Sequence, residues 1–179
     1  FLREAAQRNG HELRCYEDAL GFVARVRDRD ELVRRVDRAL PRGESDPAFR
    51  KLLKVPLYPY QREGALFAAR AGRSLLADDM GLGKTIQAIA AAEILVRAAG
   101  IERVLIVSPT SLKHQWEQDI RKFSGREALV IEGLLPRRAQ LYAADSFYKI
   151  TNYDVVARDL DAIARWQPDL IILDEAQRI

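Results

Sequence analysis

The chain has 179 residues, of which 48% are hydrophobic, and its 29 basic and 26 acidic side chains leave a formal charge of +3. This length predicts one main domain with its own hydrophobic core, because domains usually have roughly 100 to 200 residues. A single cysteine excludes an internal disulfide, and two separated histidines exclude a zinc finger. No apolar run approaches the ~20 residues of a membrane helix, so we expect a soluble intracellular protein without a membrane partner.

Residues 1–56 are predicted to form a helical accessory segment, which also holds the whole excess of positive charge. An apolar stripe at helical spacing runs through Leu32, Val33, Val36 and Leu40. Pro41-Arg42-Gly43 ends that helix. A second start follows, with Asp46 as N-cap and Pro47 at the first helical position. No chemical motif lies in this segment, and contact with other proteins is the role left open for it.

From Leu57 onward, short apolar segments alternate with longer amphipathic ones. Strands are expected at 74–77, 104–108, 128–132, 148–151 and 170–173. Helices are expected at 59–71, 84–99, 111–123, 136–144 and 154–166, with Gly72 and Gly100 ending the first two. The second and fifth strands are apolar on both faces, which is typical of a covered parallel sheet. Residues 57–179 are therefore predicted to form an α/β domain of three layers with a mostly parallel sheet.

A loop with two glycines lies between the predicted strand at 74–77 and the helix at 84–99. It reads Asp78-Asp79-Met80-Gly81-Leu82-Gly83-Lys84-Thr85. Backbone N–H groups of such a loop and of the following helix converge on one point, which suits a polyphosphate. Lys84 can reach the β- and γ-phosphates, and the Thr85 hydroxyl can ligate Mg²⁺. Because Asp78 stands where the strict pattern has glycine, a chance glycine turn is the alternative for this motif alone.

Asp174 and Glu175 follow the strand predicted at 170–173, at the end of a parallel sheet where ligands bind. Alone, the two carboxylates would fit a solvated turn. Together with the loop they favour a nucleotide site. Asp174 would hold Mg²⁺, mostly through water, and Glu175 would orient and deprotonate the attacking water.

The loop and the Asp174-Glu175-Ala176-Gln177 segment together resemble the Swi/Snf-type ATPases of helicase superfamily two, in which the position of Asp78 usually departs from the strict loop. The resemblance covers residues 57–179, with five motifs in order, and implies a RecA-like P-loop NTPase lobe that binds ATP and Mg²⁺. The nucleotide-binding residues that it implies are Gln61, Asp79, Met80, Gly81, Leu82, Gly83, Lys84 and Thr85. Gln61 is expected to contact adenine. Lys84, Glu175 and Gln177 are the expected catalytic residues, and Gln177 would link hydrolysis to movement of a second lobe.

Two polar turns carry the expected DNA contacts. The segments 107–112 and 150–154 are similar to motifs Ia and Ib of the same family. The residues expected to hold one backbone strand of double-stranded DNA are Ser108, Pro109, Thr110, Ser111, Thr151 and Asn152. Helix capping is the alternative role for these turns. Trp116 is interpreted as a packing residue, and Arg137 and Arg138 as a solvated pair.

The resemblance implies the first lobe of a DNA-dependent ATPase, which steps along duplex DNA and remodels bound proteins. The last strand of this lobe and the second RecA-like lobe, with its arginine fingers, are expected beyond residue 179, so this chain should bind nucleotide better than it hydrolyses it. A strand-separating helicase or restriction translocase is one alternative, and a nucleotide-sensing module without hydrolysis is another. The expected location is nuclear in a eukaryote, or cytoplasmic with the nucleoid in a prokaryote.

Overall fold

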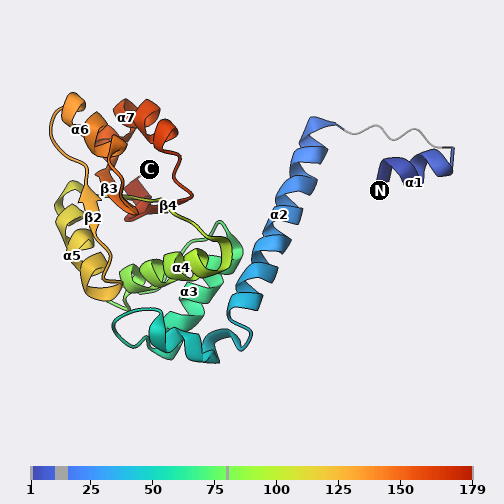
Figure 1. Cartoon of the computed structure of the whole chain (residues 1–179), viewed down its shortest axis with the longest axis horizontal. Helices are drawn as coiled ribbons and strands as arrows, with labels where there is room; N and C mark the ends of the chain where they lie inside the picture. The colour runs from blue at the N-terminus through green and yellow to red at the C-terminus, as the bar shows by residue number, and fades with distance from the viewer. Residues whose placement is uncertain (1, 11–15, 80, 179) are drawn as a thin grey trace.

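A parallel sheet of four strands forms the centre of the computed structural model, which describes residues 2–10, 16–79 and 81–178 (Figure 1). The strands are β1 (Val104–Ser108), β2 (Ala128–Val130), β3 (Tyr148–Asn152) and β4 (Leu170–Leu173), in the order β2-β3-β1-β4. All three pairings are parallel. The carboxyl ends of the strands therefore lie at one edge of the sheet.

The register brings the predicted polar residues together at that edge. Ser108 of β1 lies opposite Asn152 of β3, and Val107 lies between Thr151 and Leu173. The backbone N–H of Asp174 continues the β1–β4 ladder by donating to the Val107 carbonyl at 2.9 Å. The ends of β1, β3 and β4 thus form one contiguous region.

Helices cover both faces of the sheet (Figure 1). On one face, Val104 and Ile106 share a core with α3 (Pro59–Ala71), α4 (Lys84–Ala99) and α5 (Lys113–Phe123). More than half of the residues of α4 are buried, so this helix lies inside the molecule.

On the other face, Leu105 and Val107 pack against α6 (Leu135–Ala143) and α7 (Tyr153–Trp166). The two separate cores confirm the predicted three-layer α/β architecture. Among the described helices, none combines the length and apolar character that a membrane span requires.

Predicted bounds agree best where proline or glycine marks them. The helices expected at 59–71 and 84–99 form as predicted, and Gly72 and Gly100 both have φ of 69°. The helix expected at 111–123 begins instead with the 3₁₀ turn η3 (Thr110–Leu112), and α5 starts only at Lys113. Boundaries without such a residue shift by one or two positions, as helix and strand ends usually do.

The strand predicted at 74–77 does not form. Residues 74–79 have no regular secondary structure, and Leu75 is 73% exposed. A strand forms only where a neighbouring strand pairs with its N–H donors and C=O acceptors, and in the described part of the chain the sheet ends at β4. β4 itself is only partly covered, with Ile171 52% and Leu173 46% exposed, so the expected coverage of both faces fails for this strand.

The N-terminal segment contains the helices α1 (Leu2–Arg8) and α2 (Glu17–Ala39) and the 3₁₀ turns η1 (Gly43–Ser45) and η2 (Pro47–Lys51). The Asp46 carboxylate accepts a 2.9 Å hydrogen bond from the Ala48 N–H, which confirms the predicted cap. The last part of the segment shares the core of the α/β domain through Val36, Leu40, Phe49, Leu52 and Leu53.

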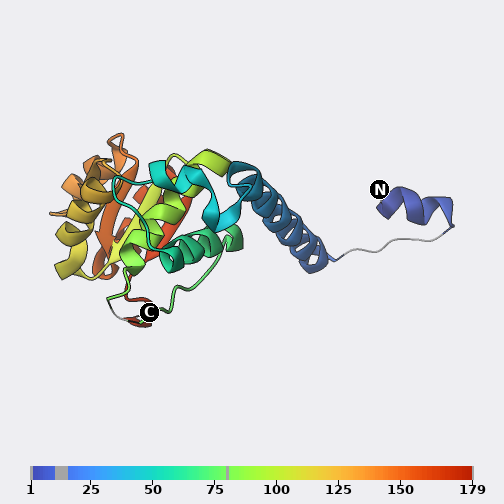
Figure 2. The ribbon, with the colours of Figure 1, turned by 90° about the horizontal axis from the view of Figure 1, so that it is seen from below.

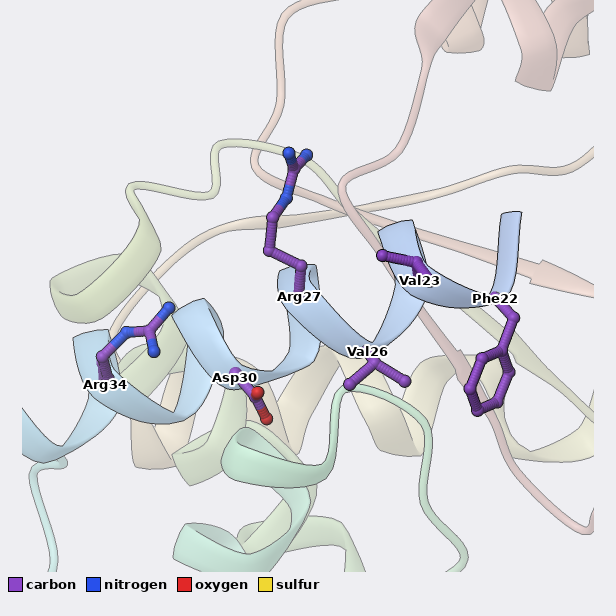
Figure 3. Close-up of a pocket in the computed structure, with 6 residues that line it drawn as sticks. All are labelled: Phe22, Val23, Val26, Arg27, Asp30 and Arg34. Atoms are coloured by element: carbon purple, nitrogen blue, oxygen red, sulfur yellow. The ribbon is translucent and has the colours of Figure 1, made fainter. Parts of the chain in front are cut away.

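The first part of α2 lies away from the α/β domain (Figure 2). Phe22, Val23 and Val26 are 61%, 55% and 43% exposed and line a shallow pocket together with Arg27, Asp30 and Arg34 (Figure 3). Their spacing of three and four residues places them along one side of the helix. This stripe is therefore exposed and does not belong to the buried core of the described residues.

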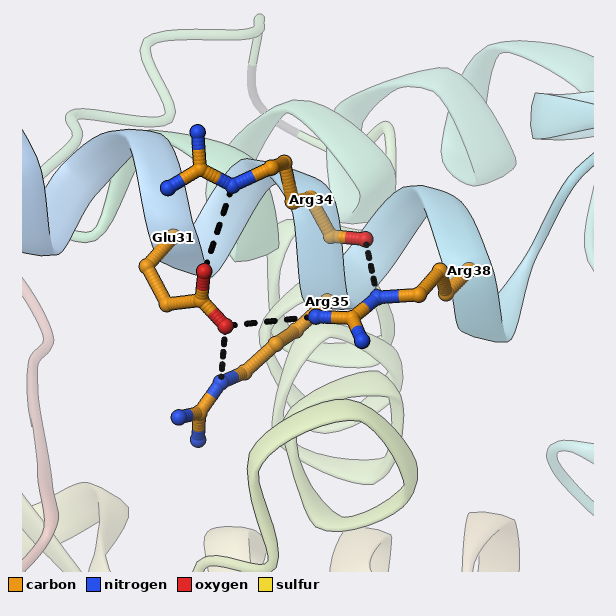
Figure 4. A network of polar contacts seen from close by, with 4 residues as sticks. All are labelled: Glu31, Arg34, Arg35 and Arg38. Carbon is orange, nitrogen blue, oxygen red and sulfur yellow. Dashed lines mark hydrogen bonds and ion pairs between the residues drawn. The ribbon is translucent and has the colours of Figure 1, made fainter.

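One carboxylate organises the arginines in the middle of α2. Glu31 accepts from Arg34, Arg35 and Arg38 at 3.0 to 3.2 Å (Figure 4). The hydrogen bonds from Arg35 and Arg34 lower the pKa of Glu31. All four side chains lie at the surface, where such pairs add little stability. The cluster therefore orders the charged side of α2 and leaves its arginines accessible.

The interpretation of Arg138 as a solvated residue is wrong. Its side chain is 8% exposed and makes two hydrogen bonds of 2.8 Å to Asp159 of α7, plus one of 2.7 Å to the Gly133 carbonyl. These bonds compensate for the loss of water around two buried charges. Arg138 thus joins α6 to α7 below the sheet and is not available to DNA.

Lys149 is a buried cation in the middle of β3. Its ammonium group donates to the carbonyls of Tyr142 and Ala144, both at 2.7 Å, and lies 4.1 Å from the centre of the Trp166 ring. Burial disfavours the charged form and lowers the pKa of Lys149 from 10.5 to about 8.

The free energy of unfolding is therefore expected to rise by about 1 to 2 kcal/mol between about pH 7.5 and pH 9.5. Folded Lys149 releases its proton near pH 8, whereas the unfolded chain holds it to 10.5, so the unfolded state binds more protons in this window. Urea unfolding at both pH values measures the gain, and Lys149→Met should remove it. Above pH 10 Tyr142 acts in the opposite sense, because burial raises its pKa to about 12. Equal pH dependence of the two proteins would contradict the prediction.

Candidate nucleotide and nucleic-acid site

The glycine loop opens directly into the N-terminus of α4. Gly81 and Gly83 have φ of 87° and 80°, a region that favours glycine. Gly83 is the N-cap of α4 and offers no side chain, and no acidic residue lies in the first turn. The first N–H groups of a 16-residue helix therefore keep their capacity for an anion, in the positive end of the helix dipole. The loop fits a phosphate group.

Lys84 bends back over this loop. Its ammonium donates to the carbonyls of Asp78 at 2.8 Å and Asp79 at 3.2 Å. A lysine has three donors, so two of them hold the loop and one remains for a ligand. These contacts tie Lys84 to the two residues before Met80, which itself lies outside the described residues.

Gln61 connects α3 to the loop. Its side-chain carbonyl accepts from the Tyr58 N–H at 3.1 Å, and its Nε2 donates to the Leu82 carbonyl at 3.3 Å. A Cβ at Gly83 would lie 2.7 Å from that Nε2, so glycine is needed here for space as well as for its φ. The structure therefore brings the predicted adenine contact against the predicted phosphate loop.

A second glutamine, which the sequence did not indicate, binds Asp78, the residue that stands where the strict loop pattern has glycine. Gln87 of α4 is fully buried, and its Nε2 donates to the Asp78 carboxylate at 2.7 Å. Its Oε1 is buried without a hydrogen-bond partner among the described residues and lies where a Cβ at Gly64 of α3 would be. A polar residue on the buried side of α4, three positions after Lys84, was the available signal.

The two predicted carboxylates follow β4. The Asp174 Oδ2 accepts from the Trp116 indole N–H at 2.8 Å, and its backbone carbonyl accepts from the Tyr153 hydroxyl at 2.7 Å. Trp116 is 4% exposed, so it packs as predicted, but its polar group has a specific partner. The local sequence pattern gave no signal for this hydrogen bond.

Glu175 and Gln177 lie next to each other after β4. The Gln177 amide donates to a Glu175 carboxylate oxygen. Glu175 has φ of 54°, in the left-handed region that residues with a side chain seldom adopt. Both side chains are exposed.

No hydrogen bond joins Lys84 or Thr85 to Asp174 or Glu175 in the described part of the chain. Within the same residues, no group of three or more His, Cys, Asp or Glu side chains is placed to hold a metal. Thr85 is half-buried at the start of α4, and Asp174 ends β4. One hydroxyl and one carboxylate suit Mg²⁺, which takes most of its ligands from water and phosphate.

The predicted DNA-binding residues divide into exposed and buried groups. Thr110 and Ser111 of η3 are exposed, whereas Pro109, Asn152, Ser108 and Thr151 are buried, the last two completely. Hydroxyl groups without surface exposure cannot reach a phosphate. Of the predicted residues, Ser111 therefore presents a free side-chain donor to a ligand in this conformation, whereas the one hydroxyl hydrogen of the exposed Thr110 is donated to Asp154.

The two polar turns are joined through one carboxylate. Asp154, in the first turn of α7, accepts from the Thr110 hydroxyl at 3.3 Å and from the Asn152 amide at 3.0 Å. The structure thus brings together segments that are 44 residues apart. They form one polar surface at the carboxyl ends of β1 and β3.

Comparison with known proteins agrees with this arrangement. The SNF2-related domain matches residues 60–179. The chain is 33% identical over 143 residues to the DNA repair and recombination protein RAD54B of Homo sapiens, covering 69% of the chain and 16% of that protein. It is 37% identical over 142 residues to the helicase SWR1 of Debaryomyces hansenii, covering 72% and 9%.

A further relative is the chromatin-remodeling ATPase INO80 of Candida albicans, 30% identical over 146 residues, which cover 72% of the chain and 10% of that protein. The chain therefore spans 9% to 16% of the length of these relatives.

Among solved structures, the SWI2/SNF2 ATPase core of Sulfolobus solfataricus in complex with double-stranded DNA aligns with a TM-score of 0.62 and 32% identity. The alignment covers 71% of this chain and 27% of that one. The glycine loop, the carboxylate pair and the parallel sheet thus occur in a chain that matches the SNF2-related domain over most of its length. The chain belongs to the SNF2-related family, the Swi/Snf-type group that its motifs resemble.

Proposed function

We propose that this chain is the ATP-binding lobe of a DNA-dependent ATPase that moves along double-stranded DNA and remodels protein–DNA complexes. The proposal depends mainly on the glycine loop that leads into α4. The N-terminus of this helix has no side-chain cap, so the loop and the first N–H groups of the helix fit a polyphosphate. Relatives named as a chromatin-remodeling ATPase and as a DNA repair and recombination protein support it. A second RecA-like lobe would complete the motor.

In this proposal the loop residues Asp79 to Thr85 bind ATP. Lys84 and the backbone N–H groups hold the phosphates, and Gln61 contacts the adenine. Thr85 and Asp174 bind Mg²⁺, which supplies charge neutralisation for the phosphates when it is bound. Met80 belongs to the same proposed set.

Glu175 accepts the proton of the attacking water in the proposed reaction. The bond from the Gln177 amide leaves the second carboxylate oxygen of Glu175 for that water. Gln177 would then sense the state of the site and pass it to the second lobe. Because Gln177 is exposed, it is accessible to such a partner.

For DNA we propose contact through the backbone phosphates. Ser111 donates to them from the exposed turn, which Thr110 holds in place through its bond to Asp154. Ser108, Pro109, Thr151 and Asn152 support the two turns from the buried side. A relative's structure in complex with double-stranded DNA supports this part of the proposal. Nuclear location in a eukaryote, or location with the nucleoid in a prokaryote, is proposed with it, as is binding of other proteins through residues 1–56.

The test is DNA binding by the chain and by a Thr110→Ala, Ser111→Ala double variant. Loss of the Ser111 donor and of the Thr110 bond that holds the turn is expected to weaken duplex binding by about 5- to 30-fold, at roughly 0.5 to 1 kcal/mol for each hydrogen bond. Affinity should not depend on sequence, since phosphates carry no base identity. With about two to four phosphates neutralised, the slope of log K against log salt should be near −0.9 for each.

Fluorescence anisotropy with scrambled duplex and single-stranded DNA across a salt series measures all three quantities. Ser45→Ala in η1 removes a hydroxyl far along the chain from both turns and serves as the matched control. Preference for single strands, strong dependence on sequence, or full affinity of the double variant would count against the proposal.

A further inference from the structure

Asp174, the proposed Mg²⁺ ligand, is held from two sides by aromatic residues whose polar groups point at it. Trp116 fixes its carboxylate at Oδ2, at 2.8 Å, and Tyr153 fixes its backbone carbonyl, at 2.7 Å. Within the described residues no hydrogen bond involves Oδ1, which therefore stays available to a metal or its water. A bond from N–H to a charged oxygen is stronger than a neutral one, so the Trp116 contact sets the orientation of this carboxylate.

Each of the two aromatic residues lies close in the chain to one of the polar turns. Trp116 lies in the first turns of α5, about 6 Å along the helix axis from the end of η3. Tyr153 is the first residue of α7 and follows Asn152 in the chain. Any shift of either turn therefore moves an aromatic side chain that contacts Asp174.

These contacts close into a ring. Thr110 is bonded to Asp154, which adjoins Tyr153; Tyr153 is bonded to Asp174, Asp174 to Trp116, and α5 leads back to Thr110. The buried Lys113, which donates to the Ile131 carbonyl at 3.2 Å, anchors the start of α5 to the end of β2. The ring contains three hydrogen bonds of 2.7 to 3.3 Å, the chain link from Tyr153 to Asp154, and the chain from Thr110 to Trp116. It can therefore pass a change at the surface of Thr110 to Asp174.

We propose that Trp116 and Tyr153 are positioning residues that couple DNA binding at the two turns to Mg²⁺·ATP binding at Asp174. The inference rests on the proposed function and adds to it the route of the coupling. Phosphates seated on Thr110 and Ser111 hold η3 and α5 in place, and the indole N–H then keeps the Asp174 carboxylate oriented for the metal. By linkage, Mg²⁺·ATP strengthens DNA binding by the same factor.

The experiment measures the affinity of the chain for a non-hydrolysable ATP analogue in four conditions, with or without Mg²⁺ and with or without duplex DNA. Trp116→Phe keeps an aromatic ring in the core and removes only the donor. It is expected to leave affinity without Mg²⁺ unchanged and to lower the gain from Mg²⁺ by about tenfold, as loss of an outer-shell partner does elsewhere. In this variant the ratio of the affinities for the analogue with and without duplex DNA should also be close to one.

Trp166→Phe is the matched control, because it removes the other tryptophan, which stacks on Lys149 and does not contact Asp174. The variant has a second use. Trp116 is then the single tryptophan of the chain, so its emission should change when Mg²⁺ is added to the complex with the analogue. This readout does not depend on hydrolysis.

Tyr153→Phe provides an independent variant if Trp116→Phe does not fold, and it should reduce the DNA effect in the same direction. Parental Mg²⁺ dependence and DNA effect in a folded variant would overturn the inference. If the parent chain binds the analogue with Mg²⁺ but its affinity does not change with DNA in any condition, the inference is overturned. The proposal of a nucleotide site is then not affected. A parent that binds no analogue at all would overturn the proposed function, and the inference with it.

Discussion

Replacement of Glu175 by glutamine is expected to slow ATP hydrolysis by about 10² to 10⁴-fold while ATP affinity stays close to the parental value. Glutamine has nearly the same shape as glutamate and can still accept the Gln177 hydrogen bond, but it cannot take a proton from water. The loss should therefore appear in kcat, with little change in KM. The measurement needs a longer protein in which this chain is joined to a second RecA-like lobe.

Two variants accompany this experiment. Asp174→Asn should weaken Mg²⁺-dependent binding as well as hydrolysis, since it alters the proposed metal ligand. Glu102→Gln makes the same change of charge just before β1, at the opposite end of the sheet from Glu175, and should have no effect. Hydrolysis by Glu175→Gln at the parental rate would remove the role proposed for Glu175.

Replacement of Lys84 by alanine is expected to weaken Mg²⁺·ATP binding by about 2 to 4 kcal/mol, roughly 30- to 1,000-fold. Two effects add. The phosphates lose a cation in a partly dry site, and the loop loses the bonds from Lys84 to the carbonyls of Asp78 and Asp79. Calorimetry with the 179-residue chain measures this change directly, because the residues proposed to bind the phosphates all lie in this chain.

Lys122→Ala is the matched control for this variant. Lys122 lies near the end of α5, where its ammonium is 5.1 Å from the centre of the Phe123 ring, and it carries the same charge on the same length of side chain. Equal affinity of Lys84→Ala and Lys122→Ala would mean that the glycine loop does not bind phosphate.

The sequence predicted local structure well where one residue type determines the backbone. Pro59 starts α3, Gly72 and Gly100 follow α3 and α4, and Asp46 caps η2, because each of these residues acts on its immediate neighbours. The strand at 74–77 was wrong because its apolar pattern says nothing about whether a neighbouring strand is present. Strand pairing is a property of the sheet, not of the segment.

The residue types of the candidate site could be predicted from the sequence, whereas several of the contacts between them could not. Motif spacing placed the glycine loop at a helix start and Asp174 at a strand end, since both follow from chain order. The bond from Trp116 to Asp174 joins residues 58 apart, and only the folded sheet brings them together. The burial of Thr151 is equally invisible in the sequence, because threonine is common both at surfaces and in strands.

Gly64 and Gln87 have a consequence for how this protein can evolve. Because Gln87 Oε1 occupies the place of a Gly64 side chain, the residue that is tolerated at position 64 depends on the residue at position 87. Alanine at 64 conflicts with glutamine at 87, whereas a smaller residue at 87 first would make room for it and release Asp78 from its bond. The effect of either substitution thus depends on the other. The order in which substitutions at positions 64 and 87 arise therefore determines which sequences of this region can evolve.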